Sequence, residues 1–195
     1  MKQAVQGPDK LAYAYRPSLF GAPWEFRLGD HGIEWSAGAK SGHVPYAGVR
    51  RVRMSFHPTS MQPRFVTEIW ANGAPRLLLA STSRKSLVVR EESAAHYAEF
   101  VTELHRRLAE AGAPARFEQG KRPWQYWPGF AIFALASLAL AATVARALRE
   151  EVWLGGAFAA AFLAIFLWRA GDYFRRNRPR LYRPDRLPSE LMPKT

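Results

Sequence analysis

The chain has 195 residues, 48% of them hydrophobic, no cysteine and a formal net charge of +12. The lack of cysteine excludes disulfide bonds and thiolate chemistry. The mean hydropathy of −0.24 is typical of a soluble protein, but it averages a polar region that ends near residue 123 with two apolar stretches that follow it. The polar region is long enough for one small domain with its own hydrophobic core.

Residues 1–19 are expected to form an N-terminal arm. This segment contains Lys2, Asp9 and Lys10 and has no continuous apolar stretch of the kind found in a signal peptide. We therefore expect the polar region to remain in the cytoplasm.

From Trp24 onward, apolar and polar residues alternate, which predicts β-strands. In residues 49–56, for example, Val52 and Met54 fall on one face and Arg51 and Arg53 on the other. Asn-Gly at 72–73 accepts positive φ angles and predicts a hairpin turn. About six antiparallel strands are expected, at residues 24–28, 33–36, 43–46, 49–56, 64–70 and 76–80.

The apolar period changes after residue 90. Tyr97, Phe100, Leu104 and Leu108 recur at helical spacing, and Gly112 is a typical helix stop. We expect one amphipathic helix over residues 91–111. The predicted fold class of residues 20–112 is α+β, with a strongly bent antiparallel sheet whose open end is covered by this helix.

The segment 32–52 resembles the bacterial pleckstrin-homology-like (PH-like) domain. The similarity lies in a Gly-apolar-x-apolar strand at 32–35, a Gly/basic turn, and the run Val44-Pro45-Tyr46 followed by Val49 and Val52. The resemblance covers about residues 20–112. It implies a partly open barrel with a C-terminal helix and a location at a membrane, and it implies no catalysis. In many such proteins the transmembrane hairpin precedes the domain, whereas here it follows.

Two uncharged stretches follow a short linker at 113–123. They cover residues 123–145 and 152–168, or roughly 34 and 25 Å as helices, compared with about 30 Å for the hydrocarbon core of a bilayer. The charged segment 146–151 separates them. We therefore predict a transmembrane helical hairpin at 124–168. Aromatic residues typical of a membrane interface lie at its ends: Trp124, Tyr126, Trp127, Trp153 and Trp168.

Other interpretations of the hairpin remain open. The two stretches could be core helices of a soluble protein, or part of a pore or transporter. Neither stretch has an ionisable residue at depth, which argues against transport. Small residues recur at Gly156, Ala160 and Ala164 and would allow close helix contacts, so the hairpin is interpreted as an anchor or an oligomerisation surface.

The tail, residues 169–195, is rich in Pro and Arg and is expected to be unfolded and to lie along the membrane. The loop at 146–151 balances its charges, so the positive-inside rule predicts a multi-pass protein of the inner (cytoplasmic) membrane with both termini in the cytoplasm. The tail could equally determine topology without binding a ligand. Its expected membrane-surface residues are Arg175, Arg176, Arg178 and Arg180.

Two basic groups in the polar region are candidates for binding an anionic lipid headgroup or an acidic peptide. The alternative is a solvated sheet face that discourages pairing between sheet edges. The first group is Lys40, Arg50, Arg51 and Arg53, and the second is Arg84 and Lys85.

No catalytic pattern is evident. The five histidines lack the spacing of metal ligands, and residues 38–42 lack the glycine that a phosphate-binding loop needs before its lysine. We expect no enzymatic activity, no metal or cofactor, and no nucleic-acid partner. The leading hypothesis is a membrane-anchored module that recruits a protein or lipid headgroup at the cytoplasmic face. The alternative is a structural subunit of a larger membrane complex that docks through its hairpin.

Overall fold

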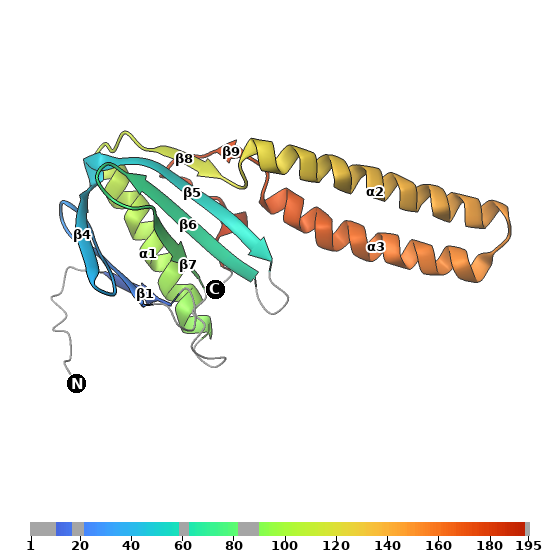
Figure 1. The fold of residues 1–195 in the computed structure, drawn as a ribbon, viewed down its shortest axis with the longest axis horizontal. Coiled ribbons are helices and arrows are strands. Elements are labelled where there is room, and N and C mark those ends of the chain that lie inside the picture. The colour runs from blue at the N-terminus through green and yellow to red at the C-terminus, as the bar shows by residue number, and fades with distance from the viewer. Residues whose placement is uncertain (1–10, 17–21, 59–62, 82–89, 194–195) are drawn as a thin grey trace. The chain divides into compact units, whose positions relative to one another are not determined.

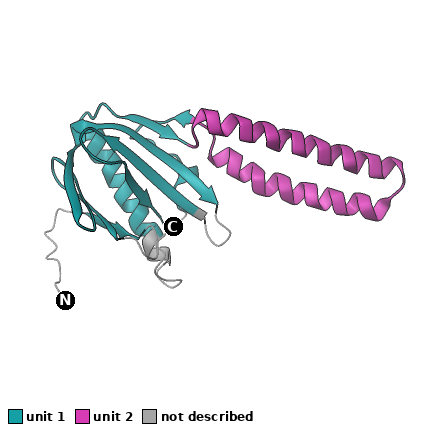
Figure 2. Cartoon of the chain, viewed as in Figure 1, with its two compact units in different colours: residues 1–119, 180–195 teal, residues 120–179 magenta. Residues whose placement is uncertain are grey.

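The computed structural model describes residues 11–16, 22–58, 63–81 and 90–193. These residues form two compact units, coloured separately in Figure 2. One unit combines Met1–Gln119 with Arg180–Thr195, and the other is Gly120–Pro179. The first unit is therefore interrupted in sequence by the second.

The first sheet of the β unit has four antiparallel strands in the order β1-β2-β3-β4. Its alternating sequence buries Phe26, Leu28 and Ile33 on one face. The strands predicted near residues 24 and 33 are confirmed, whereas β1 lies in the segment expected to be an arm. The strands are β1 (Ala12–Tyr15), β2 (Trp24–Leu28), β3 (Gly32–Ala37) and β4 (Lys40–Pro45).

The second sheet has five strands in the order β7-β6-β5-β8-β9. The short helix η1 (Tyr46–Gly48) leads into it from β4. Its strand pairs are antiparallel except for β5 and β8, which are parallel. The hairpin predicted at Asn72-Gly73 is confirmed, with Gly73 at φ 71. The strands are β5 (Val49–Pro58), β6 (Pro63–Ala71), β7 (Leu77–Ala80), β8 (Arg116–Gln119) and β9 (Arg180–Leu181).

Helix α1 (Arg90–Glu110) confirms the amphipathic helix predicted from the sequence and packs against the strands (Figure 1). Phe100 and Leu104 of α1 are buried in one hydrophobic cluster with Phe26 of the first sheet and Met54 and Ile69 of the second. The unit is thus α+β, and its described strands form two sheets rather than a closed barrel.

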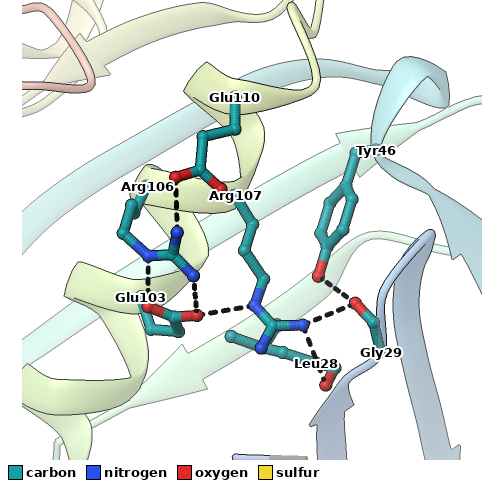
Figure 3. A network of polar contacts seen from close by, with 7 residues as sticks. All are labelled: Leu28, Gly29, Tyr46, Glu103, Arg106, Arg107 and Glu110. Carbon is teal, nitrogen blue, oxygen red and sulfur yellow. Dashed lines mark hydrogen bonds and ion pairs between the residues drawn. The ribbon is translucent and has the colours of Figure 1, made fainter. Parts of the chain in front are cut away.

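A polar network joins α1 to the turn after β2 (Figure 3). Arg107 donates to the carbonyl of Gly29 at 2.7 Å and to Glu103 at 2.7 Å. The hydroxyl of Tyr46 donates to the same Gly29 carbonyl at 2.8 Å. Arg106, followed by Arg107, lowers the pKa of the Glu103 carboxyl to about 2 by hydrogen bonding. Arg107 therefore fixes the helix to the sheet, whereas Arg106 pairs only within the helix.

The expectation of an unfolded tail is wrong for residues 180–192. β9 pairs with β8, the hydroxyl of Tyr182 donates to buried His105 of α1 at 2.8 Å, and Leu191 in the short helix η2 (Ser189–Leu191) is buried in the core. The few apolar residues of the tail anchor it, although they follow neither the period of a strand nor that of a helix. Strand β8 likewise lies where a linker was expected.

The second unit is a helical hairpin of α2 (Pro123–Arg149) and α3 (Trp153–Arg176). Both helices extend beyond the uncharged stretches, and α3 includes Arg175 and Arg176, which were expected in the tail. Aromatic rings of the two helices pack together, with the Phe133 and Phe174 centroids 5.0 Å apart.

The two ends of the hairpin meet in a short neck. The backbone N–H of Lys121 donates to the carbonyl of Asn177 at 3.0 Å, and the buried Asn177 side chain donates to the carbonyl of Tyr173 at 3.2 Å. Gly120 has φ 78, and a Cβ on it would lie 2.3 Å from the Asn177 carbonyl oxygen. The neck therefore requires glycine at this position.

Candidate functional site

One face of the five-stranded sheet carries a group of charged and aromatic side chains, here called the arginine cluster: Arg51, Arg53, Trp70, Arg116 and Glu118. Strand register places them together. In the parallel β5–β8 pair, Arg51 lies opposite Arg116 and Arg53 opposite Glu118, and Arg51 also lies opposite Trp70 of β6. Because paired residues point to the same face, the five side chains share one surface.

The Glu118 carboxylate lies at the centre of the cluster. Its Oε2 accepts a hydrogen bond from Arg53 Nε at 3.1 Å and forms an ion pair with Arg53 Nη2. Its Oε1 lies 3.5 Å from Arg51 Nε and 3.4 Å from Arg116 Nε. The guanidinium carbons of Arg51 and Arg53 also lie 5.6 and 5.5 Å from the centroid of the Trp70 ring, within cation–π range.

The three arginines differ in accessibility. Arg53 is 8% exposed, and its guanidinium group is occupied by the ion pair with Glu118 and the cation–π contact with Trp70. The side chains of Arg51 and Arg116 are 43% and 64% exposed. Within the cluster, three positive charges against one negative charge leave an excess of two, carried by the two exposed guanidiniums. Glu68, which lies opposite Arg53 in β6, pairs with Arg76 at 3.3 Å. Guanidinium groups in such positions bind carboxylate or phosphate oxygens through paired hydrogen bonds.

The structure brings together only part of the predicted basic groups. Arg51 and Arg53 lie in the cluster, whereas Arg50 is exposed where the register of β5 shifts between Val49 and Arg51. Lys40 lies in the other sheet, opposite Ala37. Arg84 and Lys85 lie outside the described residues.

Sequence reasoning missed three members of the cluster. Trp70 falls in a predicted strand without a predicted role, and Arg116 and Glu118 fall in the predicted linker at 113–123. Phe117 is the one apolar residue in Arg116-Phe117-Glu118-Gln119, so the sequence offers no alternation long enough to predict β8.

The four-stranded sheet carries an open hollow of about 510 Å³ on a mixed polar face. Acids and bases alternate along it because Arg27 lies opposite Glu34, which in turn lies opposite His43. Within the described ranges, no group of three His, Cys, Asp or Glu side chains is arranged to hold a metal ion. The lining residues are Glu25, Arg27, Glu34, Trp35, Ser36, Ser41, Gly42 and His43.

The hairpin presents a different surface. Its most apolar windows are 0% buried in α2 and 6% buried in α3, and both helices are long and apolar enough to cross a membrane. Large side chains such as Leu154, Phe158 and Trp168 are more than 70% exposed. Of the small residues, Gly156 is buried against Ala147 of α2 and so serves the hairpin itself.

The predicted membrane-surface residues fall in three places. Arg175 and Arg176 lie at the end of α3, and each forms an ion pair with Asp172 at 2.8 Å. Arg178 is exposed just after the helix, and Arg180 is in β9 of the β unit. Of the four, only Arg178 is in an irregular segment.

No protein-family model matches this chain, and no curated protein matches its sequence.

Proposed function

We propose that this protein is a membrane-anchored binding module. Its hairpin crosses the inner membrane twice, and its β unit recruits an acidic segment of a partner protein through Arg51 and Arg116 at the cytoplasmic face. The PH-like resemblance is part of this proposal, and an α+β unit with a helix packed onto two sheets is compatible with it.

The membrane location is supported by the exposed apolar side chains of the hairpin helices. Exposure of apolar surface is favourable in lipid and costs free energy in water. The neck supports two crossings, since the bond between Lys121 and Asn177 holds both ends of the hairpin together and hence on one side of a bilayer. Basic residues gather at this end, whereas the loop at the other end balances its charges, which favours a cytoplasmic neck.

The observation that carries the binding proposal is the position of Glu118. The cluster already binds one carboxylate, and the geometry that accommodates Glu118 is suited to a second one. Arg51 and Arg116 share the same oxygen of Glu118, so their guanidinium edges lie close enough to grip one further anionic group. Anchoring raises the effective concentration of the module near other membrane proteins, so that weak contacts suffice.

The test uses the full chain in nanodiscs of neutral phosphatidylcholine and a fluorescent glutamate-rich peptide. The variant R51E/R116E should weaken peptide binding about ten-fold or more, because charge-assisted contacts are lost and repulsion is added. Arg27→Glu makes the same change of charge per residue on the other sheet and should leave binding within two-fold. Arg53 is left unchanged, because reversing a buried charge would destabilise the sheet.

Unchanged peptide affinity in R51E/R116E would overturn the binding proposal. The β unit could instead bind the headgroups of phosphatidylglycerol added to the nanodiscs. If R51E/R116E abolished this lipid binding, the cluster would be assigned to lipid headgroups.

A second candidate function is a structural subunit of a larger membrane complex. The observation in its favour is that Ala160, one helical turn after Gly156, is exposed, so part of the small-residue stripe is accessible to another helix. Blue-native electrophoresis of Ala160→Leu would show loss of a large assembly if this candidate is correct. Gly156→Leu is unsuitable because it would separate α2 from α3.

A further inference from the structure

Close contacts fix the alignment of α2 and α3. A Cβ on Gly129 would lie 3.7 Å from the Phe174 ring, and one on Gly156 would lie 3.4 Å from the Cβ of Ala147. Counting from either pair along these antiparallel helices places Arg169 level with Ala134. The ring contacts of Phe133 with Phe174 and Phe166 agree with this alignment.

This alignment offsets the two uncharged stretches. α2 is free of charge from Pro123 to Ala145 and α3 from Val152 to Trp168. At the level of Arg169, α2 is still apolar and has run roughly 16 Å from its first residue. The belt in which both helices lack charge is about eleven residues, or roughly 16 Å, which is about half of a typical hydrocarbon core. Some charged side chains must therefore lie at depth.

The charges that flank this belt differ in their partners. At the loop end, Arg146 pairs with Glu150 at 2.8 Å. At the neck end, Arg175 and Arg176 share Asp172. Arg169 is exposed and has no carboxylate partner in the described part of the chain. It also lies three residues deeper than Asp172, or roughly 4–5 Å along the helix.

Tilt does not remove this offset. The centres of the uncharged stretches of α2 and α3 differ by about nine residues, or roughly 13 Å along the helices. The helix axes lie about 8–10 Å apart. Average tilts near 20° change the relative depth of two such helices by only about 3 Å. Arg169 must therefore extend along the helix to the headgroup layer, as long basic side chains do.

We propose that Arg169 binds the phosphate group of an anionic phospholipid headgroup, whose net charge is negative, in preference to that of the zwitterionic phosphatidylcholine. This inference rests on the proposed membrane function of the hairpin. An arginine at the edge of this belt, level with uncharged residues of α2 and without a carboxylate partner in the described residues, needs a counterion. The lipid phosphate is the anion that its extended side chain reaches. The planar guanidinium donates two parallel hydrogen bonds to phosphate oxygens. Trp168, exposed beside it, has the amphipathic character of a residue at this boundary.

The experiment measures lipid selectivity with the full chain in phosphatidylcholine vesicles. Spin-labelled phosphatidylglycerol and phosphatidylcholine compete for the protein surface, and their relative association constant is read from the immobilised fraction of each spectrum. Arg169→Gln should lower the preference for phosphatidylglycerol about five-fold, the effect expected of one base at an anionic surface. Arg169→Lys should retain most of that preference.

Arg178→Gln is the matched control, because Arg178 is also exposed near the neck but lies beyond α3. A change of less than two-fold in this control supports a local site at Arg169. Equal losses in both variants would indicate a diffuse surface charge and would overturn the inference, as would an unchanged preference in Arg169→Gln. Failure of the wild-type chain to float with vesicles would instead overturn the proposed function on which the inference depends.

Discussion

The helices α1 and α3 contain similar aromatic and aliphatic residues, but α1 buries them and α3 leaves them exposed. In α1, the rings and chains at Tyr97, Phe100 and Leu104 are at most 1% exposed. In α3, Leu154 is 87% and Phe158 is 77% exposed. The first helix buries one apolar stripe against two sheets, whereas the second is apolar on nearly every side. The difference is that α1 has one face for the core and one for water, whereas α3 is long and apolar enough to cross a membrane.

The largest expected effect comes from the same substitution in both helices. Phe100→Ala should destabilise the β unit by about 3–5 kcal/mol, because it leaves a cavity in a packed core. Phe158→Ala should change stability by less than about 1 kcal/mol in lipid, because acyl chains occupy the vacated space. Thermal unfolding in nanodiscs, followed by near-UV circular dichroism, measures both. Comparable losses in the two variants would show that α3 is buried in protein.

The pH dependence of folding sharpens the comparison on the α1 side. Burial lowers the pKa of His105 to about 4, from about 6.5. The neutral ring donates from Nδ1 to the carbonyl of Val101 at 2.7 Å and accepts from Tyr182 at 2.8 Å. The contribution of the neutral His105 ring to the free energy of unfolding is fully present above pH 6.5. It is lost as the pH falls toward 4, by about 3 kcal/mol in total.

The measurement is a series of thermal unfolding curves between pH 7.5 and 4, with His105→Phe as the comparison variant. The variant should show a much shallower slope over the range from 6.5 to 4. A wild-type slope that matches the variant would mean that His105 titrates normally and is accessible to water.

The neck that joins the two units is the next place to test. Gly120→Ala should cost about 2 kcal/mol or more, because it combines a positive φ with a collision against the carbonyl of Asn177. Gly73→Ala is the matched control, with a similar φ of 71 and no atom within 4 Å of the added Cβ, and it should cost about 1 kcal/mol. Equal costs in the two variants would show that the neck yields to the added methyl group.

The smallest expected effect separates two neighbouring arginines of α1 (Figure 3). Arg107→Met should destabilise the β unit by about 1–2 kcal/mol, because the Gly29 carbonyl loses a charged donor. Arg106→Met removes an exposed side chain that pairs only along the helix and should leave the unfolding temperature within error. A greater loss in Arg106→Met would reverse the roles assigned to the two residues.

The sequence predicted the elements whose apolar period extends over a long continuous segment. Strands β5 and β6 are nine or more residues long, so their alternation is visible without knowledge of their neighbours. The same holds for α1, whose apolar stripe extends over more than three turns, and for the hairpin, whose uncharged stretches stand out against a charged chain.

The missed elements depend on distant partners. β1 and β8 have four residues each and β9 has two, which is too short for a period to be recognised. Arg116 and Glu118 join Arg51 and Arg53 only because β8 pairs in parallel with β5 across more than sixty residues of sequence. The arginine cluster could therefore not be assembled from local patterns.

The pairing of β8 with β9 sets an order of events during synthesis. The ribosome delivers β8 first, then the whole hairpin, and only afterwards β9, Tyr182 and Leu191. Until the hairpin has emerged, His105 lacks its hydroxyl partner and the five-stranded sheet ends at β8. Completion of the β unit is thus delayed until the hairpin has been made, so that a chain arrested before the second helix would carry a β unit that lacks β9 and the buried Leu191.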